Sequence, residues 1–271
     1  MRKIVCEACG SNKLTKENGF FKCMHCQTKY IAKEINEIAE VESNRPKAKN
    51  FSNYIDMSQN AWLEGDYQKA FNYSNKALEI NPKAPDAWLA KMYSIEITNS
   101  NDIALDIIMC GENAIQFADN DEKEDIKDEV YGYFCIEALH LIRRATTQMS
   151  FVSFSEANHL SGELVSFAMT LKGAIPEDKI KNSSSIQEQI GSMVEECKNL
   201  FKATEKSIRS SGLTLAPVAF EGRRSIIDSF TNGLPEDKKQ EVKSQWVKQG
   251  LCPSCSRKLS LIRRRCKICS S

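Results

Sequence analysis

The amino-acid sequence predicts a mainly α-helical fold, in which a helical repeat or bundle lies between two small β modules. Three observations lead to this prediction. Apolar residues recur at spacings of three and four over most of the 271 residues. A helix–turn–helix pattern in the first half of the chain is followed by a second copy. Eight of the eleven cysteines fall in two groups, one near each end of the chain.

Composition and charge restrict the class of protein. Hydrophobic residues make up 41% and charged residues 27%, as in ordinary globular proteins. The net charge of +1 provides no overall field that would attract nucleic acid or an acidic membrane. No stretch approaches the roughly 20 apolar residues of a membrane span, and the first residues do not resemble a signal peptide. Eleven cysteines in a chain without an export signal indicate a reducing compartment, where cysteines bind metal more often than they form disulfides. We therefore expect a cytoplasmic protein.

The repeated pattern covers residues 51–106. A turn around Gly65 separates two amphipathic helices, and the second helix is expected to end before Pro82, which cannot continue it. A shift of 34 residues superimposes Tyr54 and Trp88, Ile55 and Leu89, Ser58 and Met92, Ala61 and Ile95, and Ala70 and Ala104. Such a period is typical of helix pairs that bury their apolar faces only by stacking.

The first copy carries a more specific set of residues, namely Gly65, Asp66, Tyr67, Ala70, Ala77, Leu78 and Pro82. This set resembles the signature of tetratricopeptide repeats. The second copy departs from it, because Asn99 stands at the position of Gly65 and the span 104–114 is three residues longer than the span 70–77. The resemblance implies a concave groove that binds an extended peptide or a helix of a protein partner.

The same resemblance disfavours one class of ligand. Repeats that hold a terminal carboxylate use lysine and asparagine on the inner helices, but the matching positions here are Ile55, Gln59 and Ala90. The aromatic residues of the two copies are expected to be packing residues; they are Trp62, Tyr67, Trp88 and Tyr93.

The N-terminal cysteine group consists of two Cys-x-x-Cys pairs, Cys6 with Cys9 and Cys23 with Cys26. Thirteen residues separate the pairs, and Asn18-Gly19 favours a hairpin turn between them. This spacing is typical of a tetrahedral site of four thiolates. A redox dithiol, unpaired thiols, or His25 in place of a neighbouring cysteine are the alternatives.

With Gly10 and Tyr30 added, these cysteines resemble the zinc ribbons of transcription factor IIB and of many small bacterial proteins. Gln27 departs from that pattern, because such ribbons usually have a second glycine there. The resemblance implies zinc. Rubredoxin iron sites also use paired cysteines, although with a longer and more apolar spacer.

The C-terminal group repeats the arrangement, with Cys252 and Cys255 followed after ten residues by Cys266 and Cys269. Such a module has almost no core of its own, so its folding free energy comes mainly from the metal, about 10–16 kcal/mol for structural zinc. Residues 252–271 hold no acidic residue but six basic ones, which are Arg257, Lys258, Arg263, Arg264, Arg265 and Lys267. Arg263, Arg264 and Arg265 could contact the phosphates of a nucleic acid. A solvated hairpin, or docking on the chain's own acidic run 119–129, would explain them equally.

Further helices are predicted in the second half of the chain. The acidic run at 119–129 suits the first turn of a long helix whose apolar face is Ile126, Val130, Tyr133, Phe134, Ala138, Leu141, Ile142, Ala145 and Met149. Other helices are expected over about 154–172, 185–210 and 225–230, and from Gly233 to Gly250. Cys110, Cys135 and Cys197 lie on apolar faces, which indicates buried thiols. His140 and His159 have no companion acid or thiol at a telling distance and are expected to be exposed or satisfied.

The predicted domain order follows from these features. It comprises an N-terminal zinc ribbon (1–30), a short helix and linker (31–50, with the helix from Ile31 to Val41), the tetratricopeptide-like repeat pair (51–118), a helical bundle extension (119–232), a helix leading to the second ribbon (233–249) and the C-terminal zinc ribbon (250–271). Taken whole, this order resembles uncharacterised Gram-positive bacterial and phage proteins with the same architecture.

No motif for phosphate binding, metalloprotease chemistry or a serine nucleophile is present. Four thiolates around each zinc leave no open position for water. We therefore expect a non-catalytic scaffold or adaptor that holds two zinc ions and binds an unidentified protein partner. One alternative is association with nucleic acid or with transcription machinery through the basic C-terminal ribbon, and another is an unrecognised enzymatic or redox role.

Overall fold

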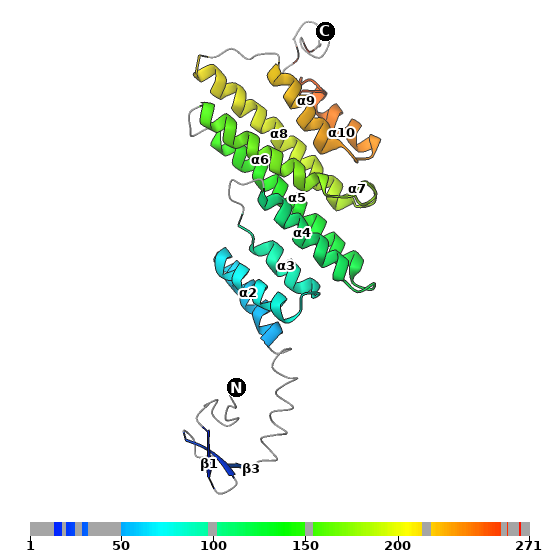
Figure 1. The fold of residues 1–271 in the computed structure, drawn as a ribbon. Helices are drawn as coiled ribbons and strands as arrows, with labels where there is room; N and C mark the ends of the chain where they lie inside the picture. The colour runs from blue at the N-terminus through cyan, green and yellow to red at the C-terminus, as the bar shows by residue number, and fades with distance from the viewer. Residues whose placement is uncertain are drawn as a thin grey trace. The chain divides into compact units, whose positions relative to one another are not determined.

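The computed structural model describes residues 14–17, 20–24, 29–31, 50–96, 102–149, 154–212, 218–255, 259 and 266 (Figure 1). The described chain is mainly helical, as predicted. It divides into two compact units, Met1–Pro82 and Lys83–Ser271, which are treated separately below. No helix in the described ranges is long and apolar enough to cross a membrane.

Three short strands form an antiparallel sheet in the first unit, in the order β1 (Leu14–Glu17), β2 (Phe20–Cys23) and β3 (Lys29–Ile31). Glu17 pairs with Phe20, so two residues connect β1 and β2, which is the loop length of a tight hairpin. The predicted turn residues 18–19 lie outside the described residues. Pairing of β2 with β3 was not expected. Ile31 ends β3 and does not begin a helix, and the rest of the helix predicted to reach Val41 lies outside the described residues.

The first unit also contains the helical residues 50–63 and α2 (Tyr67–Ile80). Gly65 has a φ of 78°, which suits the tight turn between these helices. Asp66 then caps α2, because its carboxylate accepts a hydrogen bond of 3.0 Å from the Lys69 amide. The Ser58 hydroxyl donates to the Ala70 carbonyl at 2.8 Å, so the two helices approach closely where the sequence places small side chains.

The helices of the second unit are α3 (Pro85–Ser94), α4 (Asp102–Phe117), α5 (Lys123–Gln148), α6 (Phe154–Gly173), α7 (Glu177–Asn182), α8 (Ser184–Ser210), α9 (Val218–Thr231) and α10 (Glu236–Lys248). The central helix α5 packs against α4, α6 and α8. A single core cluster extends from α3 to α10 and includes the largest buried side chains of α5, Phe134 and Leu141.

The apolar pattern located the long helices well. Eight of the nine residues predicted to face inward on α5 are buried, and Tyr133 is half-buried. The predicted helices at 154–172 and 185–210 correspond to α6 and α8. The helix expected at 225–230 is longer and begins at Val218, whereas α7 was not predicted. The assignment of residues 51–118 to tetratricopeptide repeats, and of the chain's ends to zinc ribbons, stays a prediction.

The predicted burial of single residues is confirmed at some positions and wrong at others. Trp88 and Tyr93 pack against the core of the second unit, as expected. Trp62 and Tyr67, expected to be packing residues, keep 40% and 38% of their surface exposed. The buried thiols are confirmed at Cys110, Cys135 and Cys197, and burial raises the pKa of Cys110 and of Cys135 to about 12.

The two histidines are exposed, but each has a nearby acid, contrary to the expectation from sequence. Glu137 lies 3.7 Å from Nδ1 of His140, and Glu163 lies 3.7 Å from Nδ1 of His159. Both acids are one helical turn away on the same helix, at separations of three and four residues, so these are surface pairs within one helix.

Candidate metal centre

The centre begins where α10 ends. Gly250 takes a φ of 72°, its amide donates to the Val247 carbonyl at 2.9 Å, and the Leu251 amide donates to the Trp246 carbonyl at 2.9 Å. These bonds are those of a glycine-capped helix C-terminus. The chain therefore leaves the helix in a defined direction, and Cys252 is the second residue after the glycine.

Cys252 and Cys255 stand on either side of a tight turn. The Ser254 amide donates a hydrogen bond of 3.4 Å to Sγ of Cys252. Leu259 packs against the cysteine cluster, and its amide donates to the Gly250 carbonyl at 2.8 Å. This backbone bond ties the segment after the turn to the residue that ends α10.

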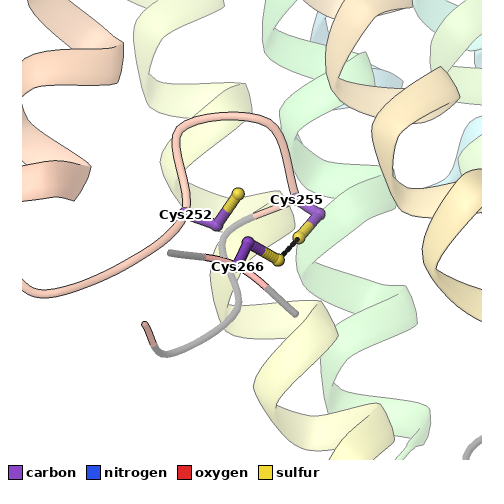
Figure 2. Close-up of side chains that lie close together, drawn as sticks. All are labelled: Cys252, Cys255 and Cys266. Atoms are coloured by element: carbon purple, nitrogen blue, oxygen red, sulfur yellow. Dashed lines mark hydrogen bonds between the residues drawn. The ribbon is translucent and has the colours of Figure 1, made fainter. Parts of the chain in front are cut away.

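Cys266 completes a group of three sulfurs (Figure 2). The Sγ atoms of Cys252, Cys255 and Cys266 all lie within 4.8 Å of one another, and those of Cys255 and Cys266 are 3.7 Å apart. Tetrahedral zinc with Zn–S bonds of about 2.3 Å requires sulfurs about 3.8 Å apart, whereas a disulfide requires about 2.05 Å. All three cysteines are buried, with at most 5% exposure. The group could therefore hold a metal ion.

The helical bundle holds this group in place. Trp246, on the last turn of α10, is 1% exposed, and Leu251 packs against the main core. On α8, the buried Lys198 donates to Oε1 of Gln249 at 2.9 Å and pairs with Glu195. Its ammonium group therefore lies at the C-terminal end of α10, where positive charge complements the helix dipole.

Three of the four predicted C-terminal ligands are thus brought together. The fourth, Cys269, lies outside the described residues, as do Arg263, Arg264 and Arg265. At the N-terminal module Cys23 ends β2, and its side chain is not among those described; Cys6, Cys9, Cys26 and the alternative ligand His25 also lie outside the described residues. Within the described ranges, the three cysteines form the one group of three or more potential ligands with adjacent donor atoms.

Three of the supporting residues, Lys198, Gln249 and Leu259, were missed by the sequence reasoning. Lys198 follows Val194 by four residues on the inward stripe of α8, so a charged residue in an apolar pattern was the available signal. Gln249 and Leu259 carry no comparable signal, because their contacts depend on the turn after α10.

Comparison with known proteins adds no further assignment, since no protein-family model, curated protein or solved structure matches this chain. The class that the fold and the site define is a mainly helical protein with a buried three-cysteine group next to the C-terminal end of α10.

Proposed function

We propose that the C-terminal centre is a structural zinc site, with Cys269 as the fourth ligand beside Cys252, Cys255 and Cys266. The observation that carries this proposal is the buried group of three sulfurs, all within 4.8 Å of one another, in which Cys255 and Cys266 are 3.7 Å apart. Thiolate sulfur is a ligand that zinc favours, and four thiolates leave no coordination position for a reacting water. The site then supports structure and does not catalyse hydrolysis.

From this centre we infer the larger function, a non-catalytic zinc-binding scaffold or adaptor. A second zinc ion at Cys6, Cys9, Cys23 and Cys26 belongs to the same proposal, and its support is the matching cysteine spacing and the hairpin formed by β1 and β2. The tetratricopeptide-like helices provide the surface for a protein partner. The resemblance to Gram-positive bacterial and phage proteins with this order of modules, and a cytoplasmic location, are part of the proposal.

Metal content tests the zinc proposal. Purified full-length protein is expected to contain two zinc ions per chain by elemental analysis, and Cys266→Ser is expected to lose one of them. Cys135→Ala is the matched control, because Cys135 is a buried thiol on α5 that belongs to neither cysteine group. Zinc content that is unchanged by Cys266→Ser would rule out the C-terminal site.

Partner capture tests the scaffold. Gln59 and Trp62 are exposed on the helical residues 50–63, whereas Ile55 is 9% exposed and contributes to packing. Gln59→Ala and Trp62→Ala are therefore expected to abolish recovery of a partner without unfolding the protein, and Ile55→Ala is expected to act mainly through stability. If the same partner is recovered equally well with both surface variants, these helices do not form the binding surface.

A second candidate function, nucleic-acid binding, is favoured by the six basic residues and no acidic one after Cys252. Binding is then expected to weaken steeply with salt, because phosphate contacts release counterions. Replacing Arg263, Arg264 and Arg265 by alanine is expected to lower the affinity and the salt dependence together. If no nucleic acid binds at low salt, this candidate is rejected.

A further inference from the structure

A groove runs along α8 in the second unit, with α10 beside it; both helices are labelled in Figure 1. Its volume is about 630 Å³, within the usual range of ligand sites. Its lining residues on α8 extend from Ser184 to Glu196, a length of about 18 Å at 1.5 Å per residue. An extended peptide covers that length with about five residues.

The groove carries an excess of negative charge. Its charged lining residues are the acids Glu188, Glu195, Glu196 and Glu241 and the bases Arg143 and Lys238. Two of the acids are already paired, Glu241 with Lys238 at 3.3 Å and Glu195 with the buried Lys198. Within the described part of the chain, neither Glu188 nor Glu196 forms an ion pair. Oε2 of Glu196 accepts a hydrogen bond of 3.2 Å from the side-chain amide of Asn199. Because a carboxylate can accept several hydrogen bonds, both glutamates can still pair with an incoming cation.

The floor of the groove is apolar. Leu234 and Trp246 are 3% and 1% exposed, and Val242 packs partly buried against the core. Gly191 lies between Glu188 and Glu196 on α8, and a Cβ added there would meet no described atom within 4 Å. The missing side chain leaves space into which an apolar side chain of a ligand would fit.

We propose that this groove binds a short basic segment of a partner protein in which basic and apolar side chains alternate. In an extended segment alternate side chains point to the same side, so the apolar residues would enter the space at Gly191 and Val242. The long basic side chains on the other side would bend back over the edge of the groove and place their charged ends at Glu188 and Glu196. Glu188 and Glu196 would supply the ion pairs. The same negative charge repels phosphate, which disfavours a nucleic acid here. This surface uses neither the tetratricopeptide-like helices nor the cysteine group, so it is independent of the function proposed above.

Three labelled pentapeptides test the proposal with the zinc-loaded full-length protein by fluorescence anisotropy. They are Lys-Leu-Lys-Leu-Lys, its acidic counterpart Glu-Leu-Glu-Leu-Glu, and its polar counterpart Lys-Ser-Lys-Ser-Lys. The first peptide is expected to bind at least about tenfold more tightly than either counterpart, a difference of about 1.4 kcal/mol. Its binding should weaken as salt is added, because exposed ion pairs are screened.

Two variants locate the binding. Glu188→Lys combined with Glu196→Lys is expected to weaken the first peptide at least about tenfold, by repulsion across the groove. Gly191→Trp is expected to do the same by filling the space while leaving every glutamate in place. Asp119→Lys combined with Asp121→Lys is the matched control; it changes the net charge equally, and both aspartates are exposed and outside the groove. Circular dichroism and melting temperature establish that each variant is folded.

Equal binding of all three peptides, or of none, would overturn the proposal. So would wild-type affinity in either groove variant when that variant is folded. Equal weakening by the control pair would show that net charge, and not the groove, attracts the peptide, which also overturns it. The scaffold proposal is tested by a different surface and by zinc content, so it can stand or fall separately.

Discussion

Gly111 lies where α4 packs closely against α5. A Cβ at this position would lie 2.6 Å from Cγ1 of Val130 and 2.9 Å from Cζ of Phe134, both of them buried on α5. Gly111→Ala is therefore expected to lower the free energy of unfolding by about 1–3 kcal/mol through overpacking. Chemical denaturation measures the change.

The control for this substitution is Gly132→Ala on the adjacent helix. No described atom lies within 4 Å of a Cβ added at Gly132, so only the intrinsic helix preference changes. This variant is expected to gain roughly 0.5–1 kcal/mol. If Gly111→Ala also stabilises the protein, α4 and α5 do not pack as described.

Tyr93 provides a prediction about pH. Its hydroxyl donates to Oε1 of Glu129 at 2.6 Å. Burial, followed by the bond to Glu129 and the charge of that carboxylate, raises the pKa of Tyr93 well above its ordinary value of 10.0. The folded state thus favours the neutral phenol, and this stabilisation is complete below pH 10 and is lost as the pH rises above it. Wild type is expected to exceed Tyr93→Phe in stability by about 1 kcal/mol at neutral pH.

The pH dependence of that difference is the measurement. Denaturation curves of the two proteins should differ by a constant amount up to about pH 10 and should converge above it, because only the wild type must keep Tyr93 neutral. A constant difference for Tyr93→Phe at all pH values would contradict the assigned role of Glu129.

At the scale of elements, a buried arginine attaches α9 to α8. Arg223 is 4% exposed, and its guanidinium donates to Oε1 of Glu205 at 2.6 Å and to the Phe201 carbonyl at 3.1 Å. The same group stacks over the Phe201 ring, 5.0 Å from its centre. Arg223→Ala is expected to cost about 1–3 kcal/mol, because the half-buried Glu205 loses its closer cation and keeps only Arg209, at 3.7 Å.

A double-mutant cycle separates the pair from the packing. The double variant Arg223→Ala, Glu205→Gln should cost less than the sum of the two single changes. Once Arg223 is absent, Glu205 has no ion pair with it left to lose. The free energies come from urea denaturation of the four proteins. Simple additivity would mean that Arg223 acts through packing on Phe201 alone.

The end of α10 links a helix to the candidate metal centre. Gly250 has a φ of 72°, and a side chain in that conformation costs roughly 1–2 kcal/mol although no described atom would clash with it. Gly250→Ala is expected to weaken zinc binding by about fivefold or more, because the strain falls on the turn that sets the direction of Cys252. Competition with a chromophoric chelator measures the affinity, and Gly132→Ala again serves as the control. Unchanged affinity would show that the conformation of the helix cap does not affect metal binding at the three-cysteine group.

At the scale of the whole molecule, long periodic features were predictable from the sequence and local ones were not. The helices α5 and α8 have many turns, so their apolar residues at spacings of three and four identify both the helix and its buried face. The pair Cys252 and Cys255 was also recognisable from its two-residue gap, and both residues lie in the three-cysteine group. By contrast α7 has six residues and β3 has three, which is too short for a period to emerge.

The buried cations show a second limit of prediction from the sequence. Lys172, Lys198 and Arg223 are at most 4% exposed, although residue type places such side chains at the surface. Each is held by acceptors distant in sequence: the Nζ of Lys172, for example, donates to the Asn232 carbonyl at 2.5 Å. A tertiary partner of this kind leaves no periodic trace. The groove beside α8 is of the same kind, since it exists only after α10 has folded back along that helix.

Removal of metal distinguishes the roles of the two apolar clusters in the second unit. The cysteine cluster contains Cys252, Cys255 and Cys266 with Leu259, whereas the main core is formed by other residues from α3 to α10. Small zinc domains unfold without metal because they lack a core, but this bundle has a core that does not depend on the sulfurs. A strong chelator is therefore expected to leave most of the helical circular dichroism intact.

The local effect of chelation should be larger. Amides of the last turn of α10 and of Leu251 are expected to lose protection against hydrogen exchange, because the centre no longer holds the segment that follows the helix cap. Amides of α5, which lie in the main core, should keep their protection and serve as the internal control. Cys266→Ser should reproduce the pattern without any chelator. If chelation instead unfolds α5 and α10 together, the cysteine cluster and the bundle form one cooperative unit, and a bound metal would stabilise the whole second unit as well as the turn between Cys252 and Cys255.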